Sequence, residues 1–283
     1  MMSVDALVTT DWVAQHLDDP DVVIAEVDED ASAYHESHIP GAIGFDWKLD
    51  FQDPVRRTFL DREGFEKLLD SRGITNDHHV VLYGGNNNWF AAYAYWYFRV
   101  YGHDKVSLMN GGRKAWEVEG REFTADPTPV TPTSGYKASE PDASIRARRD
   151  EILSAYVEAP DGTALVDVRS PAEYAGEVLA PEHLQNESAQ VPGHIPGAAN
   201  VPWSNAVDPE KGTFLPVDEL RELYASKGVT GDKKVAAYCR IGERSAHTWF
   251  VLHELLGYDD VKNYDGSWTE YGSLIDVPVE RGA

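Results

Sequence analysis

The sequence predicts an α/β protein made of two tandem domains, each with a mostly parallel sheet flanked by helices. Three observations lead to this prediction. The chain has 283 residues, which is long for one hydrophobic core and comfortable for two. Short apolar segments alternate with segments of helical spacing, a pattern typical of parallel sheets. The same series of segments also occurs twice along the chain.

The repeat is clearest in two matching segments, His-Ile-Pro-Gly-Ala-Ile from His38 and His-Ile-Pro-Gly-Ala-Ala from His194. Four other pairs keep the same order in both halves. They match residues 7–13 with 145–152, 22–28 with 164–169, 80–84 with 235–239, and 106–111 with 261–266. The second half carries an extra segment at residues 177–190, which we expect to act as a lid or wall if it lies beside a site.

The first half shows strand and helix patterns in alternation. Apolar runs predict strands over Val22–Val27, Val80–Tyr83 and Val106–Met109. Helical spacing predicts helices over Asp61–Arg72 and Asn88–Val100, and the stretch around Trp12 stays unassigned.

A proline-rich segment separates the two halves. Prolines 127, 129 and 132 forbid helix and favour an extended path, which predicts a linker over residues 125–143. The expected domains are therefore residues 1–124 and residues 144–283.

The second half contains a strand, a short loop and a helix around the single cysteine of the chain. Val235–Tyr238 reads as a buried strand, so Cys239 is the first residue after it. Helical spacing begins about six residues later and ends at Gly257. The helix N-terminus, Arg240 and Arg244 would each stabilise a thiolate, which is the nucleophilic form of cysteine.

Cys239 could instead be a small buried apolar residue, as most free cysteines are. A core cysteine, however, needs neither a glycine nor two arginines in its loop. The loop reads Cys-Arg-x-Gly-x-Arg-Ser, and it resembles the active-site loop of the rhodaneses, the thiosulfate sulfurtransferases. The resemblance implies two side-by-side α/β domains and a Cys239 persulfide, with Ile241, Gly242, Glu243 and Ser245 supplying the loop backbone.

The position that matches Cys239 in the first half is Gly84. The first half therefore lacks the nucleophile. This resembles two-domain rhodaneses, which have an inactive N-terminal domain and a catalytic pocket between the domains.

Three arginines are candidates for binding the substrate. Arg240 and Arg244 lie in the loop, and Arg169 follows the strand over residues 164–168, at the edge of the sheet where ligands gather. A guanidinium there could hold a sulfonate with paired hydrogen bonds. The alternative for Arg169 is an ion pair with Asp167 or Glu173. The resemblance favours the substrate role.

Weaker candidates are His38, Trp12 and His247. Because the His-Ile-Pro-Gly-Ala segment is present in both halves, it is more simply a structural turn. Only family resemblance keeps His38 and Trp12 as candidates. His247 lies in the first turn of the helix after the loop and could support the thiolate as an imidazolium.

Composition limits the partners and the compartment. The net charge is −23, and only 10 of the 25 basic residues are lysines. Such a surface repels nucleic acid and anionic membranes, and it favours adaptation to high salt over a moderately acidic protein of low-salt conditions. With one cysteine, no apolar run of spanning length and no signal-peptide pattern, we expect a cytoplasmic protein.

The predicted activity is transfer of the outer sulfur of thiosulfate to cyanide or a thiol. No metal or cofactor is required, because the cysteine carries the sulfur. Alternatives are a 3-mercaptopyruvate sulfurtransferase and a non-enzymatic rhodanese-like module for binding or sulfur relay. A cysteine phosphatase is a further alternative, but those enzymes place five residues between Cys and Arg, whereas this loop has four. The loop length therefore argues against a phosphatase. The oligomeric state stays open.

Thiosulfate enzymes of the family resemble Cys-Arg-Lys-Gly-x-Thr, and mercaptopyruvate enzymes resemble Cys-Gly-Ser-Gly-x-Thr. Arg240 at the second position of the loop matches the thiosulfate pattern and therefore favours thiosulfate as the donor. Ile241 and Arg244 depart from both patterns, and we interpret Arg244 as restoring the charge lost at Ile241.

Overall fold

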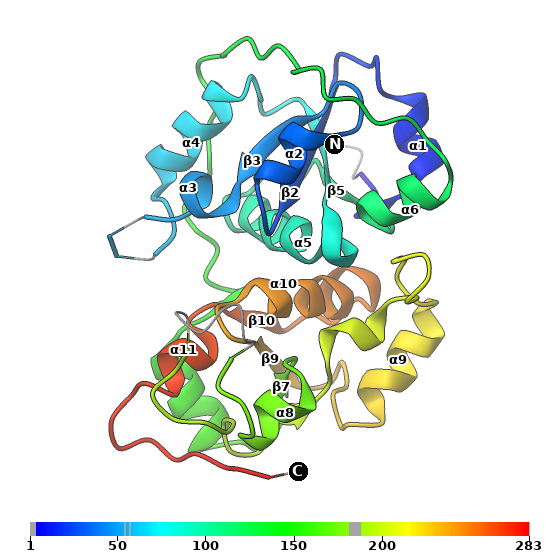
Figure 1. The fold of residues 1–283 in the computed structure, drawn as a ribbon. Coiled ribbons are helices and arrows are strands. Elements are labelled where there is room, and N and C mark those ends of the chain that lie inside the picture. Colours follow the sequence, from blue (N-terminus) through cyan, green and yellow to red (C-terminus); the bar gives the residue numbers. More distant parts are fainter. Residues whose placement is uncertain (1–3, 54, 57, 181–187, 283) are drawn as a thin grey trace. The chain divides into compact units, whose positions relative to one another are not determined.

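The protein is described here by a computed structural model that covers residues 4–53, 55–56, 58–180 and 188–282. The chain divides into two compact units (Figure 1). The first contains residues up to Asp142 together with Asp208–Phe214, and the second contains Ala143–Val207 with the residues from Leu215 onward. Most of the segment expected as a linker, residues 125–142, thus lies within the first unit.

The first unit is built on a five-stranded, all-parallel sheet in the order β1-β5-β4-β2-β3. Its strands are β1 Leu7–Val8, β2 Val22–Asp28, β3 Ile43–Asp46, β4 His79–Tyr83 and β5 Val106–Met109. Its helices are α1 Thr10–Gln15, α2 Ser32–Glu36, α3 Trp47–Phe51, α4 Arg62–Ser71, α5 Gly85–Val100 and α6 Gly112–Val118. The predicted strands and helices all form, and the stretch around Trp12 is helix α1.

The second unit repeats this topology, with a parallel sheet in the order β6-β10-β9-β7-β8. Its strands are β6 Arg146–Ala147, β7 Thr163–Asp167, β8 Ala199–Asn200, β9 Lys234–Tyr238 and β10 Val261–Tyr264. Its helices are α7 Arg149–Glu151, η1 Ile152–Val157, α8 Pro171–Ala175, η3 Trp203–Ala206, α9 Val217–Ala225, α10 Glu243–Phe250, η4 Val251–Leu255 and α11 Ser267–Tyr271. The identical strand order agrees with the repeat in the sequence.

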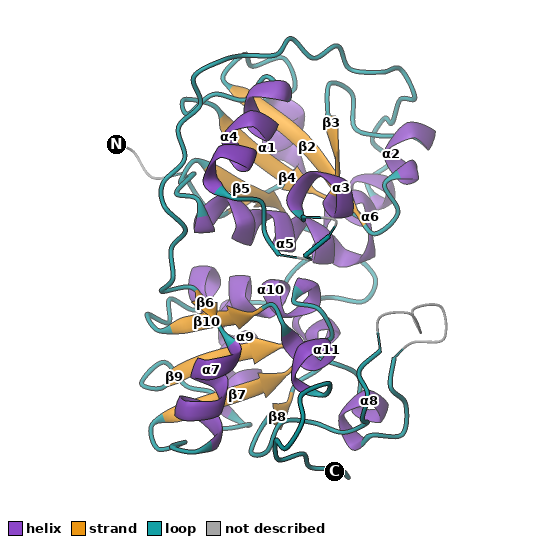
Figure 2. Cartoon of the chain, turned by 90° about the vertical axis from the view of Figure 1, so that its left-hand side faces the viewer, coloured by secondary structure: helices purple, strands orange, loops and turns teal. Residues whose placement is uncertain are grey.

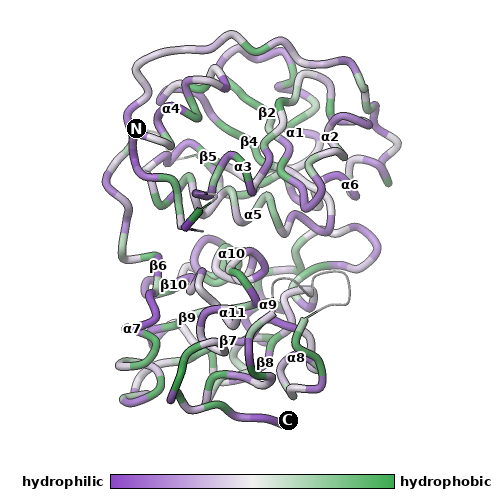
Figure 3. Tube along the Cα trace, turned by 60° about the vertical axis from the view of Figure 1, so that its left-hand side comes forward, coloured by the Kyte–Doolittle hydropathy of each residue, from purple (hydrophilic) through white to green (hydrophobic). Residues whose placement is uncertain are grey.

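Helices flank the parallel strands in each unit (Figure 2). The predicted α/β class with two such sheets is therefore confirmed. Hydrophobic residues concentrate along the strands, as the tube of β2 and β4 shows (Figure 3). Along β4 and β9 nearly every side chain is buried, as expected for strands covered on both faces.

Candidate active site

The loop after β9 forms a tight turn at Cys239. Gly242, the N-cap of α10, has φ +100°, a left-handed conformation that side chains rarely adopt. An added Cβ there would lie 2.6 Å from the Cα of Asp265. Because this glycine turns the chain so sharply, α10 begins at Glu243, about two residues earlier than the sequence pattern suggests.

The sulfur of Cys239 lies at the N-terminus of α10. Its Sγ accepts a hydrogen bond from the Gly242 N–H at 3.2 Å, and the thiol donates to Oε2 of Glu243 at 3.3 Å. Both Cys239 and Glu243 are 0% exposed. The sulfur is thus held between one backbone donor and one carboxylate acceptor.

Two residues of the β10–α11 segment anchor the loop. The Cys239 N–H donates to Oγ of Ser267 at 3.0 Å, and Ser267 has φ +53°. The amide of Asn263 donates to the Gly242 carbonyl and accepts from the Ser245 hydroxyl. These bonds fix the loop backbone before a substrate arrives.

The electrostatic balance at the sulfur differs from the expectation. Burial raises the pKa of the Cys239 thiol, and the neighbouring carboxylate of Glu243 raises it further. The Arg244 guanidinium and the backbone N–H groups of Ser245 and Gly242 lower this pKa, but by less. The pKa of the Cys239 thiol is therefore raised, whereas the basic loop suggested that it would be lowered.

Arg244 forms a two-pronged ion pair with Glu173 on α8, at 3.0 and 3.1 Å. Both side chains are almost fully buried. Burial alone would raise the pKa of Glu173, but the charge and hydrogen bonds of Arg244, with the Ser170 N–H, lower it to about 2. The pair ties α10 to α8.

The other two candidate arginines also have carboxylate partners. Arg240 Nη2 lies 3.4 Å from Oε1 of Glu243. Arg169 donates hydrogen bonds to the Asp167 carboxylate through Nε and Nη2, and to the Gly193 carbonyl. This is the ion pair with Asp167 that was the alternative to a substrate role. Its guanidinium also lies 4.8 Å from the Trp268 ring centroid. The three arginines expected to bind the substrate are thus matched by three buried carboxylates.

Both His-Ile-Pro-Gly-Ala segments make the same contacts. His38 Nδ1 bonds the Tyr34 carbonyl and its ring stacks on Tyr34, and His194 does the same with Tyr174. A histidine whose Nδ1 and ring make the same contacts in both units supports the structural interpretation of this segment.

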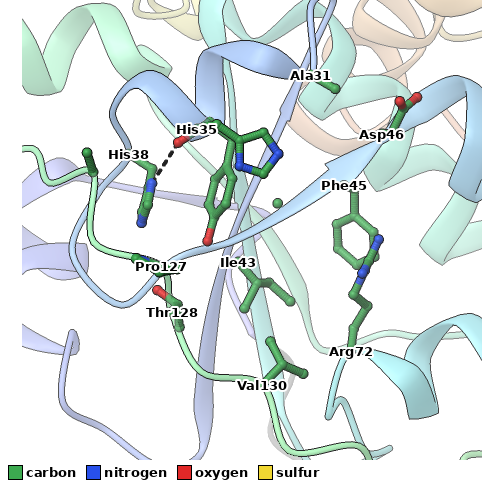
Figure 4. A pocket seen from close by; sticks show the side chains of 13 residues that line it. Ala31, His35, His38, Ile43, Phe45, Asp46, Arg72, Pro127, Thr128 and Val130 are labelled. Atoms are coloured by element: carbon green, nitrogen blue, oxygen red, sulfur yellow. Dashed lines mark hydrogen bonds between the residues drawn. The ribbon is translucent and has the colours of Figure 1, made fainter.

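His38 also lines a cavity of about 500 Å³ in the first unit. Phe45 and Arg72 line the opposite side of this cavity (Figure 4). Nε2 of His38 lies 3.1 Å from the Asp126 carbonyl oxygen. Trp12, the other first-unit candidate, stacks on His16 with 3.9 Å between ring centroids. His247 is buried in the second unit and meets Trp203 edge to face.

The first unit has no room for a cysteine at the matching position. A Cβ on Gly84 would lie 2.2 Å from the Val27 carbonyl oxygen. Asn86, Asn87 and Asn88 then follow in the left-handed conformation, which asparagine tolerates better than most residues. The loop after β4 therefore differs from the Cys239 loop in backbone as well as in side chains.

Three residues of this site, Ser267, Asn263 and Glu173, were not among the sequence candidates. Ser267 matches Gly112 in the repeat, and the two share the left-handed conformation, with φ +53° and +55°. The serine at a position occupied by glycine in the other half could have indicated from the sequence that Ser267 has a special role. Glu173 was considered only as a partner of Arg169, and nothing in the local pattern links it to Arg244.

The extra segment at residues 177–190, expected to act as a lid or wall, lies partly outside the described residues, which omit 181–187. Among the described residues, no group of three or more His, Cys, Asp or Glu side chains could hold a metal ion. No helix among the described residues is long and apolar enough to span a bilayer.

Comparison with known proteins identifies the family of the chain. The family described as Rhodanese-like domain matches residues 9–119 and again residues 151–274. Two relatives named "Putative thiosulfate sulfurtransferase" align over nearly the full length of both chains. The Saccharopolyspora erythraea protein is 61% identical, covering 98% of this chain and 96% of its own. The Haloferax volcanii protein is 54% identical, covering 98% and 97%.

Solved structures of an ergothioneine biosynthesis enzyme share the fold. The Chlorobium limicola enzyme with trimethyl histidine has a TM-score of 0.85 and 26% identity, covering 98% of this chain and 70% of its own. A structure of EanB with the same TM-score and identity contains a cysteine persulfide with ergothioneine.

Proposed function

Because the chain belongs to the rhodanese-like domain family through both of its halves, we propose that it is a thiosulfate sulfurtransferase that uses Cys239 as its sulfur carrier. The two domains support sulfurtransferase activity, and full-length relatives at 54–61% identity carry that name. The observation that carries the proposal is the position of the Cys239 sulfur, which accepts a hydrogen bond from the backbone N–H of Gly242, the N-cap of α10.

The proposed mechanism has two steps. The Cys239 thiolate attacks the outer sulfur of thiosulfate, the S–S bond of the donor breaks, and sulfite leaves with the bonding electrons. A thiophilic acceptor, cyanide or a thiol, then attacks the outer sulfur of the persulfide. Donors such as the Gly242 N–H stabilise the persulfide anion because they already point at the sulfur.

The direct test is an assay for thiocyanate from thiosulfate and cyanide, run with a panel of sulfur donors. Turnover with thiosulfate supports the proposal, and preference for 3-mercaptopyruvate favours the second candidate. A non-enzymatic binding or relay module would give no turnover with any donor. Retention of Cys239 within an ordered loop speaks against that module.

Donor choice is proposed to depend on Arg240, and the test is Arg240→Gly. A charge-assisted hydrogen bond to a buried anion is worth roughly 1.5–3 kcal/mol, or about tenfold to a hundredfold in binding. We expect kcat/KM for thiosulfate to fall by about that factor and kcat/KM for 3-mercaptopyruvate to fall less. Equal losses with both donors would show that Arg240 does not select between them.

For Arg169 and Arg244 the proposed contribution to substrate binding is indirect. Each guanidinium is held by a carboxylate partner, which positions the strand end and the loop. We propose that the backbone from Ile241 to Ser245, rather than these two side chains, forms most of the cradle around the transferred sulfur.

The acidic surface is proposed to be an adaptation to high salt in the cytoplasm. With 48 acidic against 25 basic residues, the folded chain repels itself at low ionic strength. The Debye length is about 30 Å at 0.01 M salt and about 3 Å at 1 M, so KCl screens this repulsion.

We therefore expect the melting temperature to rise steadily from dilute buffer to molar KCl. Thermal unfolding followed by circular dichroism measures it. A melting temperature that stays constant over this range would remove the salt-adaptation proposal.

A further inference from the structure

The carboxylate of Glu243 is in hydrogen-bond contact with the nucleophile. Its Oε2 accepts from the Cys239 thiol at 3.3 Å, while Oε1 faces Arg240 at 3.4 Å. It is 0% exposed. A carboxylate that is buried against the thiol can accept the thiol proton directly, so the proton need not pass to bulk water.

The charges around Glu243 in the second unit are balanced. Arg240 faces it directly, and Arg244, which follows it on α10, is held by Glu173. His247 follows one turn along the same helix. A thiolate formed by losing a proton to solvent would leave this set with an extra negative charge. The dianion thiosulfate would then add two more.

We propose that Glu243 is a catalytic residue that takes the proton of Cys239 when the sulfur attacks and returns it when the sulfur leaves. This proposal rests on the proposed sulfur transfer and adds a proton acceptor to it. Cys239 and Glu243 act as one unit that shares a single proton.

In the first half-reaction the S–H proton moves to Oε2 of Glu243. The thiolate bonds to the outer sulfur of thiosulfate, and the S–S bond of the donor breaks with its electron pair leaving on sulfite. The site then holds a persulfide anion beside a neutral carboxyl group. The charge of the protein set is unchanged, because the sulfur atom is transferred without charge and sulfite leaves as a dianion.

In the second half-reaction the acceptor attacks the outer sulfur. The persulfide S–S bond breaks, and its electron pair returns to Sγ of Cys239, which takes the proton back from Glu243. No oxidant or reductant is needed, because the sulfur passes between nucleophiles at a constant total oxidation state.

This arrangement predicts a particular pH dependence. The reactive pair, thiolate with neutral carboxyl, contains the same number of protons as the resting pair, thiol with carboxylate. Its fraction is therefore independent of pH as long as the pair holds a single proton. When the carboxylate is absent, the thiolate forms only by losing its proton to solvent, and its fraction rises tenfold per pH unit below the thiol pKa.

The test is Glu243→Gln, which keeps the size and polarity of the side chain. We measure the single-turnover release of sulfite from thiosulfate between pH 5.5 and 9.5. Wild type should give a nearly flat rate below the thiol pKa. The Gln variant should lose this flat region, with its rate rising about tenfold per pH unit up to the thiol pKa. Glu243→Asp should keep the flat region, because it keeps a carboxylate.

Glu222→Gln is the matched control, since it removes a carboxylate from the exposed face of α9 and should leave the profile unchanged. A constant factor of loss at every pH would assign Glu243 a merely structural role. That result overturns the proposal.

A second readout does not depend on turnover. Thiolate absorbance near 240 nm, taken as the difference from Cys239→Ser, titrates the only thiol of the chain. Removing the adjacent negative charge should lower the midpoint by about one pH unit or more. If wild type releases no sulfite, the proposed function is wrong. The titration still shows in that case whether the charge of Glu243 acts on the Cys239 thiol. Equal midpoints in wild type and Glu243→Gln would overturn the proposal.

Discussion

Cys239→Ser is expected to abolish sulfur transfer while leaving the fold intact. Cys239 is the single cysteine of the chain, so no other thiol can replace it. A serine hydroxyl does not form a stable anion beside a carboxylate, and its oxygen does not carry sulfur reversibly. Loss of a nucleophile typically costs at least about 10⁴-fold in turnover.

Thiocyanate formation from thiosulfate and cyanide measures this loss, and thermal unfolding checks the fold. Cys239→Ala should be equally inactive, because both variants lack the sulfur. Activity that survives in either folded variant would mean that another group carries the chemistry.

Arg244→Met is expected to cause the largest loss of stability among the site variants. Removing the guanidinium leaves Glu173 charged and buried without its two-pronged partner. Breaking one side of a buried ion pair costs about 3–5 kcal/mol. Urea unfolding of the variant and wild type measures the difference.

The matched control is the double variant Arg244→Met with Glu173→Leu. It replaces the whole ion pair with apolar side chains, which is often neutral for stability, so most of the loss should be recovered. A single variant within about 1 kcal/mol of wild type would show that the pair contributes little.

The same pair predicts how stability depends on acid. The pKa of Glu173 is lowered from 4.5 to about 2 on folding, so its contribution is fully present above pH 4.5 and disappears as pH falls toward 2. A difference of this size corresponds to roughly 3 kcal/mol. This acid-dependent part of the stability curve should be missing in Arg244→Met.

Much of the fold follows from patterns that depend on neighbouring residues alone. Strand Val106–Met109 was predicted with the bounds that the structure has, because a short apolar run between polar segments has few alternatives. The repeat added the duplication, and the identical strand orders follow from it.

The Cys239 loop could also be located from the sequence, but its electrostatics could not. Arg240 and Arg244 look like free positive charges in the sequence. Their partners depend on how the chain folds: Glu173 comes from α8, about seventy residues earlier, and Glu243 turns toward the sulfur because Gly242 adopts a left-handed conformation. Tertiary contacts of this kind leave no periodic signal.

The measurement that tests the account most directly is the intact mass of the protein after thiosulfate. Wild type incubated with thiosulfate and freed of small molecules should gain the mass of one sulfur atom, located on Cys239 by peptide mapping, and cyanide should remove it. The same treatment of Cys239→Ser should leave the mass unchanged. A wild-type protein that turns over thiosulfate but never gains this mass, or gains it at another residue, would contradict the Cys239 persulfide.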